Sequence, residues 1–385
     1  MDRRTLGLTI ALFVACNGGD GGDDAPDAAP PIDFDEAAML AHLGEDVVLP
    51  IYEQFRDEAG ALAGAVDAYC DALGTAGEVA ARESARDAWR AAMATWQLAE
   101  LTQLGPASTA GDALRDVIYS WPLVAPCSVD KEVVALRDDP TGYDIATKLT
   151  NRRGLDVLEY LLFYESLDTI CPPLAAPKGW NELPEAERAA ARCAYSRTAS
   201  ADLAAQSSAL VDAWIPFVDE LVVDPDGANL VFGALFYLDL KTKDQKLAKP
   251  AGLATNTCSV PDAPCALDLE SQFAHRSKDH VGANVRAFRL LFFGETLAGD
   301  DGIGFDDFLR AANAGDIADA LLADVVEALA AVEGMPGTMA EALAGDYASV
   351  VGAHTEVRDV TDALKGDVPA TLGLRIPDEA GGDAD

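Results

Sequence analysis

The amino-acid sequence predicts an all-α fold. Long stretches rich in Ala, Leu and Glu place apolar residues at positions i, i+3, i+4 and i+7, the spacing that gives a helix one apolar face. Alternating runs of β-branched residues, which are typical of strands, are scarce. Hydrophobic residues make up 50% of the 385 residues, so the chain can bury a substantial core.

The expected helices follow one another along the chain, at about 36–48, 51–72, 78–104, 110–120, 143–165, 185–221, 229–239, 268–294, 305–313, 316–333 and 338–364. Pro50 and Pro216 should kink or break their helices, and Gly105-Pro106 and Gly294 indicate helix ends. Loop-rich zones lie at 166–184 and 240–267. We expect the first zone to divide the chain into an N-terminal bundle at 36–165 and a C-terminal bundle at 185–376. The last residues, 377–385, are expected to form a disordered tail.

The N-terminus is typical of an export signal. Arg3 and Arg4 precede an apolar stretch, 6–15, that is too short to span a bilayer as a mature helix, and Cys16 follows it. This arrangement resembles a lipoprotein signal, with a signal peptide at 1–15 and lipidation at Cys16; a cleaved secretory signal with an unmodified Cys is the alternative. The segment 16–35 is rich in Gly, Asp, Ala and Pro and predicts a disordered tether between lipid and domain.

The charge balance is strongly acidic. Lys and Arg number 28 and Asp and Glu number 65, which gives a formal net charge of −37. This excess argues against nucleic acid or an anionic membrane surface as a partner. It suits a cationic ligand, but a charge excess is more often simply a solvated surface.

Six cysteines remain beyond Cys16: Cys70, Cys127, Cys171, Cys193, Cys258 and Cys265. An even number in an exported chain predicts disulfides, but spacing alone does not fix the pairing. Cys258 and Cys265 form the simplest local pair, and Cys171 could pair with Cys193 across the excursion between them.

The best candidate for a site is the acid pair Asp156 and Glu159, which lies inside an otherwise apolar segment. Residues three apart share one face of a helix, and an apolar helix is normally buried. Two buried acids need a metal or a cation beside them. We therefore weigh a metal or ligand site against an ion pair with Arg152 or Arg153.

Two further segments could complete this site. Glu100 falls on the apolar stripe of Trp89, Met93 and Trp96, so it could supply a third oxygen ligand, or it could be exposed at the helix end. The segment 270–280 gathers polar residues that could close the site, namely Glu270, Ser271, His275, Ser277 and Asp279.

The order of these segments over residues 36–376 resembles the imelysin family of bacterial envelope proteins, which is classed among the metallopeptidases. The matching segments are 48–52, 89–106, Ser120-Trp121-Pro122, 154–163, 246–250, 270–279 and 372–376. Within 154–163, Gly154, Asp156 and Glu159 stand where the family signature has Gly-x-His-x-x-Glu. Asp156 therefore replaces the signature His.

The resemblance implies two helical bundles with a cleft between them, a periplasmic or outer-membrane location and a link to iron uptake. Carboxylates favour harder cations than imidazole does. We therefore expect a lipid-anchored protein of the outer membrane that binds a divalent or trivalent metal ion, with iron the leading candidate, or an iron-linked ligand. Its partners would be the membrane, through the N-terminal lipid, and an iron-uptake system. The expected metal ligands are Asp156, Glu159 and Glu100, with Arg153 and Trp96 behind them. The alternatives are a metallopeptidase that uses Glu159, and a structural lipoprotein without metal.

Overall fold

We describe the fold from a computed structural model, which places residues 32–108, 114–258, 260 and 263–381. The predicted signal peptide, Cys16 and most of the tether lie outside these described residues. The all-α prediction is confirmed, since the described part of the chain contains helices and no strand.

The described residues of the first half of the chain form the α-helices α1 (Glu36–His42), α2 (Leu49–Asp71), α3 (Glu78–Ala99), α4 (Leu114–Ile118), α5 (Pro126–Asp138), α6 (Leu155–Phe163) and α7 (Glu185–Val223). The second half contains α8 (Gly227–Leu235), α9 (Lys249–Ala251), α10 (Ser277–Phe293), α11 (Phe305–Ala311), α12 (Gly315–Gly334), α13 (Met339–Gly345), α14 (Tyr347–Lys365) and α15 (Asp367–Leu372). Two segments are π-helical: η1 (Leu43–Val48) and η6 (Leu238–Ala248).

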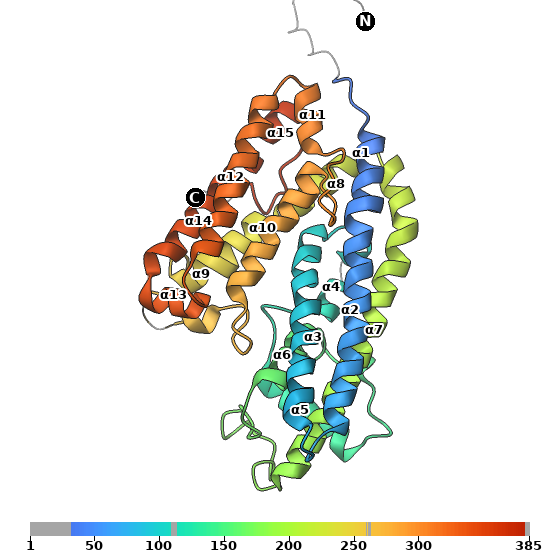
Figure 1. Ribbon diagram of the computed structural model, residues 1–385, viewed down its shortest axis with the longest axis vertical. Helices are drawn as coiled ribbons and strands as arrows, with labels where there is room; N and C mark the ends of the chain where they lie inside the picture. Colours follow the sequence, from blue (N-terminus) through green and yellow to red (C-terminus); the bar gives the residue numbers. More distant parts are fainter. Residues whose placement is uncertain (1–31, 109–113, 259, 261–262, 382–385) are drawn as a thin grey trace, which may run out of the picture. The chain divides into compact units, whose positions relative to one another are not determined.

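Two groups of long helices carry most of the core. Figure 1 shows α2, α3 and α7 running side by side, and α2 contacts both of the others. In the second group α12 packs against α10 and α14, and α14 also contacts η6. Contact between α3 and α10 joins the two groups. The predicted bounds, 36–165 and 185–376, assign α7 to the C-terminal bundle. In the structure α7 packs against α2, which belongs to the first group of helices.

Several helix boundaries differ from the predicted ones for local reasons. α6 begins only at Leu155, because Gly154 has a φ of 92° that a continuing helix does not allow. α10 begins at Ser277 and not at 268, and His275 in the preceding loop has a φ of 57°. α5 was not predicted; it begins with Pro126 in its first turn, where proline is well tolerated. α7 continues through Pro216.

Three disulfides hold the six cysteines: Cys70–Cys193, Cys127–Cys171 and Cys258–Cys265. The local pair matches the expectation, but a Cys171–Cys193 bridge was wrong. Cys193 lies on α7, where it reaches Cys70 at the end of α2, because these helices are neighbours. The partner of Cys193 was thus set by the packing of α7 against α2.

No single helix in the described ranges is both long and apolar enough to cross a membrane. Only α7 taken together with Gly227–Ala251 passes by length and composition, as a pair bent by 119°.

Candidate functional site

Helix α6 forms the floor of the candidate site. Gly154 precedes it, and a Cβ there would lie 2.4 Å from the backbone oxygen of Ile118, so only glycine fits. Every residue from Leu155 to Leu162 is buried. Apolar residues of α6 pack on α5 and α7 through Val157 and Tyr160. The predicted burial of the acid pair is observed, since Asp156 and Glu159 are each only 4% exposed.

Asp156 is held at the start of α6 by neutral donors. Its Oδ2 accepts a hydrogen bond from the hydroxyl of Ser120, and its Oδ1 accepts one from the backbone N–H of Val157 at 3.0 Å. Burial raises the pKa of Asp156 to about 7, and these hydrogen bonds only partly oppose the effect. Asp156 therefore binds a proton more readily than an ordinary aspartate.

Glu159 holds the loop that precedes α10. Its Oε1 accepts three hydrogen bonds, from the Ser271 hydroxyl at 2.8 Å, the Phe273 N–H at 3.0 Å and the Ala274 N–H at 2.8 Å. Burial outweighs these bonds and raises the pKa of Glu159. Among the described residues no donor is bonded to its Oε2, so this oxygen remains available to a ligand.

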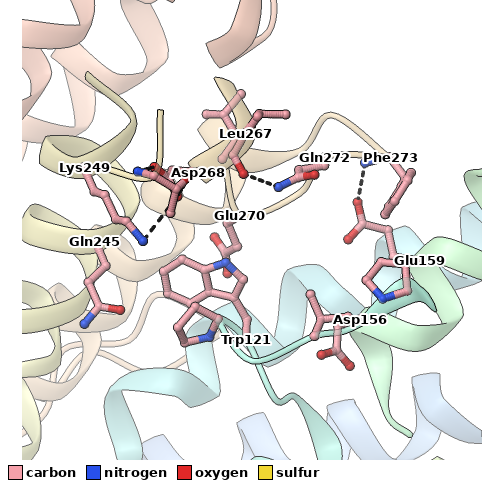
Figure 2. Close-up of a pocket in the computed structure, with 15 residues that line it drawn as sticks. Trp121, Asp156, Glu159, Gln245, Lys249, Leu267, Asp268, Glu270, Gln272 and Phe273 are labelled. Carbon is pink, nitrogen blue, oxygen red and sulfur yellow. Dashed lines mark hydrogen bonds and ion pairs between the residues drawn. The ribbon is translucent and has the colours of Figure 1, made fainter. Parts of the chain in front are cut away.

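The two acids line a pocket of about 230 Å³. Figure 2 shows the Trp121 ring, Glu270 and the ion pair of Lys249 and Asp268 around the same space. Asp156 and Glu159 are bonded to different segments of the chain, 120 and 271–274, so the pocket lies where these segments meet α6. Its walls are therefore both acidic and aromatic.

Behind the pocket lies a buried ion network centred on Lys246. The Lys246 ammonium contacts Glu100 at 2.6 Å and Glu270 at 2.9 Å, and all three side chains are fully enclosed. It also donates to the side-chain oxygens of Gln97 at 2.7 Å and Asn284 at 2.9 Å. A buried ammonium needs such partners because its desolvation is costly.

Glu270 connects this network to the pocket. It accepts a hydrogen bond from the Tyr119 hydroxyl at 2.9 Å, and its Oε2 lies 3.1 Å from His280 Nδ1. Burial acts to raise the pKa of Glu270, but the charges of Lys246 and His280 outweigh it and hold this pKa below its usual range. Glu270 is therefore an anion in the pocket wall, whereas burial raises the pKa of both acids of α6.

Other predicted site residues lie elsewhere. Glu100 is buried, but it does not join the acid pair. It contacts Lys246 at 2.6 Å and Arg115 at 3.4 Å. Arg153 does not support Asp156 and does not form the alternative ion pair; its Nε donates to Asp202 on α7 at 2.7 Å. Arg152 likewise pairs with Glu132.

The rest of the predicted set divides between the core and the surface. Trp96 is a core residue that packs on Phe55. Ser277 caps the loop by accepting from the Ser271 N–H at 3.0 Å. His275 is exposed, and Asp279 pairs with Arg276 at 3.0 Å, so neither lines the pocket.

Sequence reasoning missed the central cation, Lys246, because the zone 240–267 was expected to be mostly loop. The π-helical η6 carries Lys246 and Lys243 into the interior, where both are 1% exposed. The lysines at 243 and 246 within one short segment were the available signal. Ser120, the hydrogen-bond partner of Asp156, lies in the Ser120-Trp121-Pro122 segment, but nothing in the sequence there indicated contact with an acid.

The donor set decides what kind of cation could fit. Among the residues the structure describes, no three His, Cys, Asp or Glu side chains form a group suited to a metal ion. Asp156 and Glu159 offer carboxylate oxygens to one pocket, and hydrogen bonds from neighbouring groups commonly orient carboxylate ligands. Asp156 and Glu159 therefore suit a metal ion that arrives already bound to other ligands. They do not suit a site in which three or more protein side chains enclose the ion.

Comparisons with known proteins agree with this architecture. The family model described as imelysin, Peptidase_M75, matches residues 48–364. An imelysin-like protein from Psychrobacter arcticum 273-4 has a similar crystal structure, with a TM-score of 0.68 and 20% identity over 89% of this chain and 98% of that one. A protein named as an iron-regulated protein A precursor, from Parabacteroides distasonis ATCC 8503, gives a TM-score of 0.67 and 17% identity over 90% and 97% of the two chains. No curated protein matches the sequence.

Proposed function

Since this chain belongs to the imelysin family, we propose that it is a cell-envelope binding protein that holds a metal ion, together with the metal's own ligands, in the pocket of Asp156 and Glu159. Iron is the metal we propose. The similarity to a protein named as iron-regulated supports this choice, and so does the preference of hard cations for carboxylate oxygens.

The observation that carries the proposal is that Asp156 and Glu159, each 4% exposed, line one pocket, where burial raises the pKa of both carboxyls. A buried carboxyl has a raised pKa when no cation offsets the loss of water. A metal ion at this position would supply that charge and favour the ionised form of both groups. Binding should therefore release protons.

An envelope location is supported by two features of the chain. Three disulfides suit an oxidising compartment, and the sequence at 1–16 has the character of a lipoprotein signal. We propose anchoring through a lipid on Cys16, with the outer membrane as its site and an iron-uptake system as its partner.

The test is calorimetric titration of the purified protein with iron(III) acetohydroxamate. The Asp156→Asn/Glu159→Gln variant should bind at least ten-fold more weakly, since it loses both charges. Asp306→Asn is the matched control, because burial also raises the pKa of Asp306 to about 7 and this residue does not line the pocket. Equal affinity of the double variant and the wild type for the iron complex would refute Asp156 and Glu159 as the binding residues.

Two further measurements on the purified protein distinguish metal binding from a metallopeptidase and from a structural role. Proton release on binding, measured in buffers of different ionisation enthalpy, is expected for the wild type and not for the double variant. Hydrolysis of an unfolded protein that stops with a chelator and with Glu159→Gln would favour the metallopeptidase instead. Absence of any metal binding would favour a structural role.

A further inference from the structure

A second hollow, of about 280 Å³, lies between α3 and α10 and shares no lining residue with the acidic pocket. Its basic lining residues are Arg90 of α3, Arg276 at the start of α10, and His280 and Arg286 of α10. Such a gathering is unusual here, because acidic residues outnumber basic ones 65 to 28 in the chain.

The arginines differ in how far they are already neutralised. Arg90 pairs with Glu83 at 2.9 Å and Asp87 at 2.5 Å, and Arg276 pairs with Asp279, which also lines the hollow. Arg286 has no carboxylate partner among the described residues, and its Nε makes only a long contact with the Gly282 oxygen at 3.4 Å. Arg286 is thus the guanidinium with the most unused donor capacity.

His280 and the helix terminus add to this basic character. The His280 ring is 2% exposed and its Nδ1 faces Glu270, so its Nε2 is the ring nitrogen left for the hollow. α10 starts with no side-chain cap, and the first N–H groups of a helix favour negative charge. Two residues of its first turn, Asp279 and His280, line the hollow.

We propose that this hollow binds a small organic anion that carries two or three carboxylate groups, with Arg286 as its main anchor. The basic groups come from separate positions on two helices, so a ligand with several anionic ends can reach more of them than a single phosphate can. Guanidinium also matches the planar carboxylate with paired hydrogen bonds. The site is separate from the proposed metal pocket and does not depend on it.

Calorimetric titration of the metal-free protein with citrate tests the site, with inorganic phosphate as the comparison at equal ionic strength. Citrate should bind, and Arg286→Gln should weaken it ten-fold or more, since a charge-assisted hydrogen bond is lost. Arg289→Gln is the matched control: it lies on the same helix, pairs with Glu295 at 2.7 Å and does not line the hollow.

We expect Arg289→Gln to bind citrate with the same affinity as the wild type. The assignment is overturned if citrate does not bind, if phosphate binds as tightly as citrate, or if both arginine variants lose affinity equally. Thermal melting of each variant without ligand checks that the fold is intact. Failure here leaves the iron titration unaffected, because that experiment uses a hydroxamate complex and the α6 acids.

Discussion

Replacing Asp156 by Asn should change how stability depends on pH. The pKa of Asp156 is 3.8 as an ordinary aspartate and about 7 in the fold, so the folded state holds this proton more tightly. The stabilisation is therefore fully present below about pH 3.8 and is lost as the pH rises through about 7. Asn keeps an oxygen for the Ser120 hydroxyl and cannot ionise.

The magnitude follows from these two pKa values. At about pH 5 the bound proton contributes about 2.7 kcal/mol to the free energy of unfolding, and at about pH 8 it contributes almost nothing. The wild type should therefore lose about 2.6 kcal/mol more than Asp156→Asn between these pH values.

Urea unfolding at both pH values, with equal slopes for the two proteins, measures the difference. Asp306→Asn gives a second comparison, because Asp306 lies outside the pocket and has a similar pKa, so its effect should add to that of Asp156→Asn. If Asp156→Asn and the wild type lose the same free energy between the two pH values, the raised pKa of Asp156 is refuted.

Three further changes test the scaffold. Lys246→Met removes the ammonium that the buried carboxylates of Glu100 and Glu270 share, so we expect a loss of about 3–5 kcal/mol in urea unfolding; a cost below about 1 kcal/mol would mean that the network does not need this charge. Gly154→Ala forces a φ of 92° on alanine and places its Cβ against the Ile118 oxygen, so we expect a loss of about 3 kcal/mol or more, and an unchanged melting temperature would contradict the geometry. The double variant Cys70→Ser/Cys193→Ser removes a disulfide with a sequence separation of 123 and should cost up to about 5 kcal/mol. Unfolding with and without reductant measures this cost, and the reductant should destabilise the variant less than the wild type.

The sequence predicted helices well where apolar periodicity was long, as in α2, α3 and α7. It failed where a single backbone angle sets the boundary. The φ of 92° at Gly154 separates α6 from the short 3-10 turn of Thr150–Arg152, and periodicity does not encode that angle.

The site was predictable only in part, for a related reason. The burial of Asp156 and Glu159 follows from the apolar residues around them in the same helix. Their bonding partners come from positions 36 and 112 residues away for Ser120 and Ser271. Arg153 illustrates the limit, because its nearest acids in sequence are not its partners and Asp202, 49 residues on, is.

Lys246 also bears on the stability that the fold would have without the proposed metal ion. Proteins whose core acids are neutralised by a bound metal lose folding free energy when a chelator removes that metal. Here Glu100 and Glu270 share the Lys246 ammonium and also face Arg115 and His280, so their counter-charges belong to the chain and stay in place during dialysis or chelation. This network therefore does not require a metal ion to stay folded, and the metal binding proposed for the neighbouring pocket need not involve unfolding.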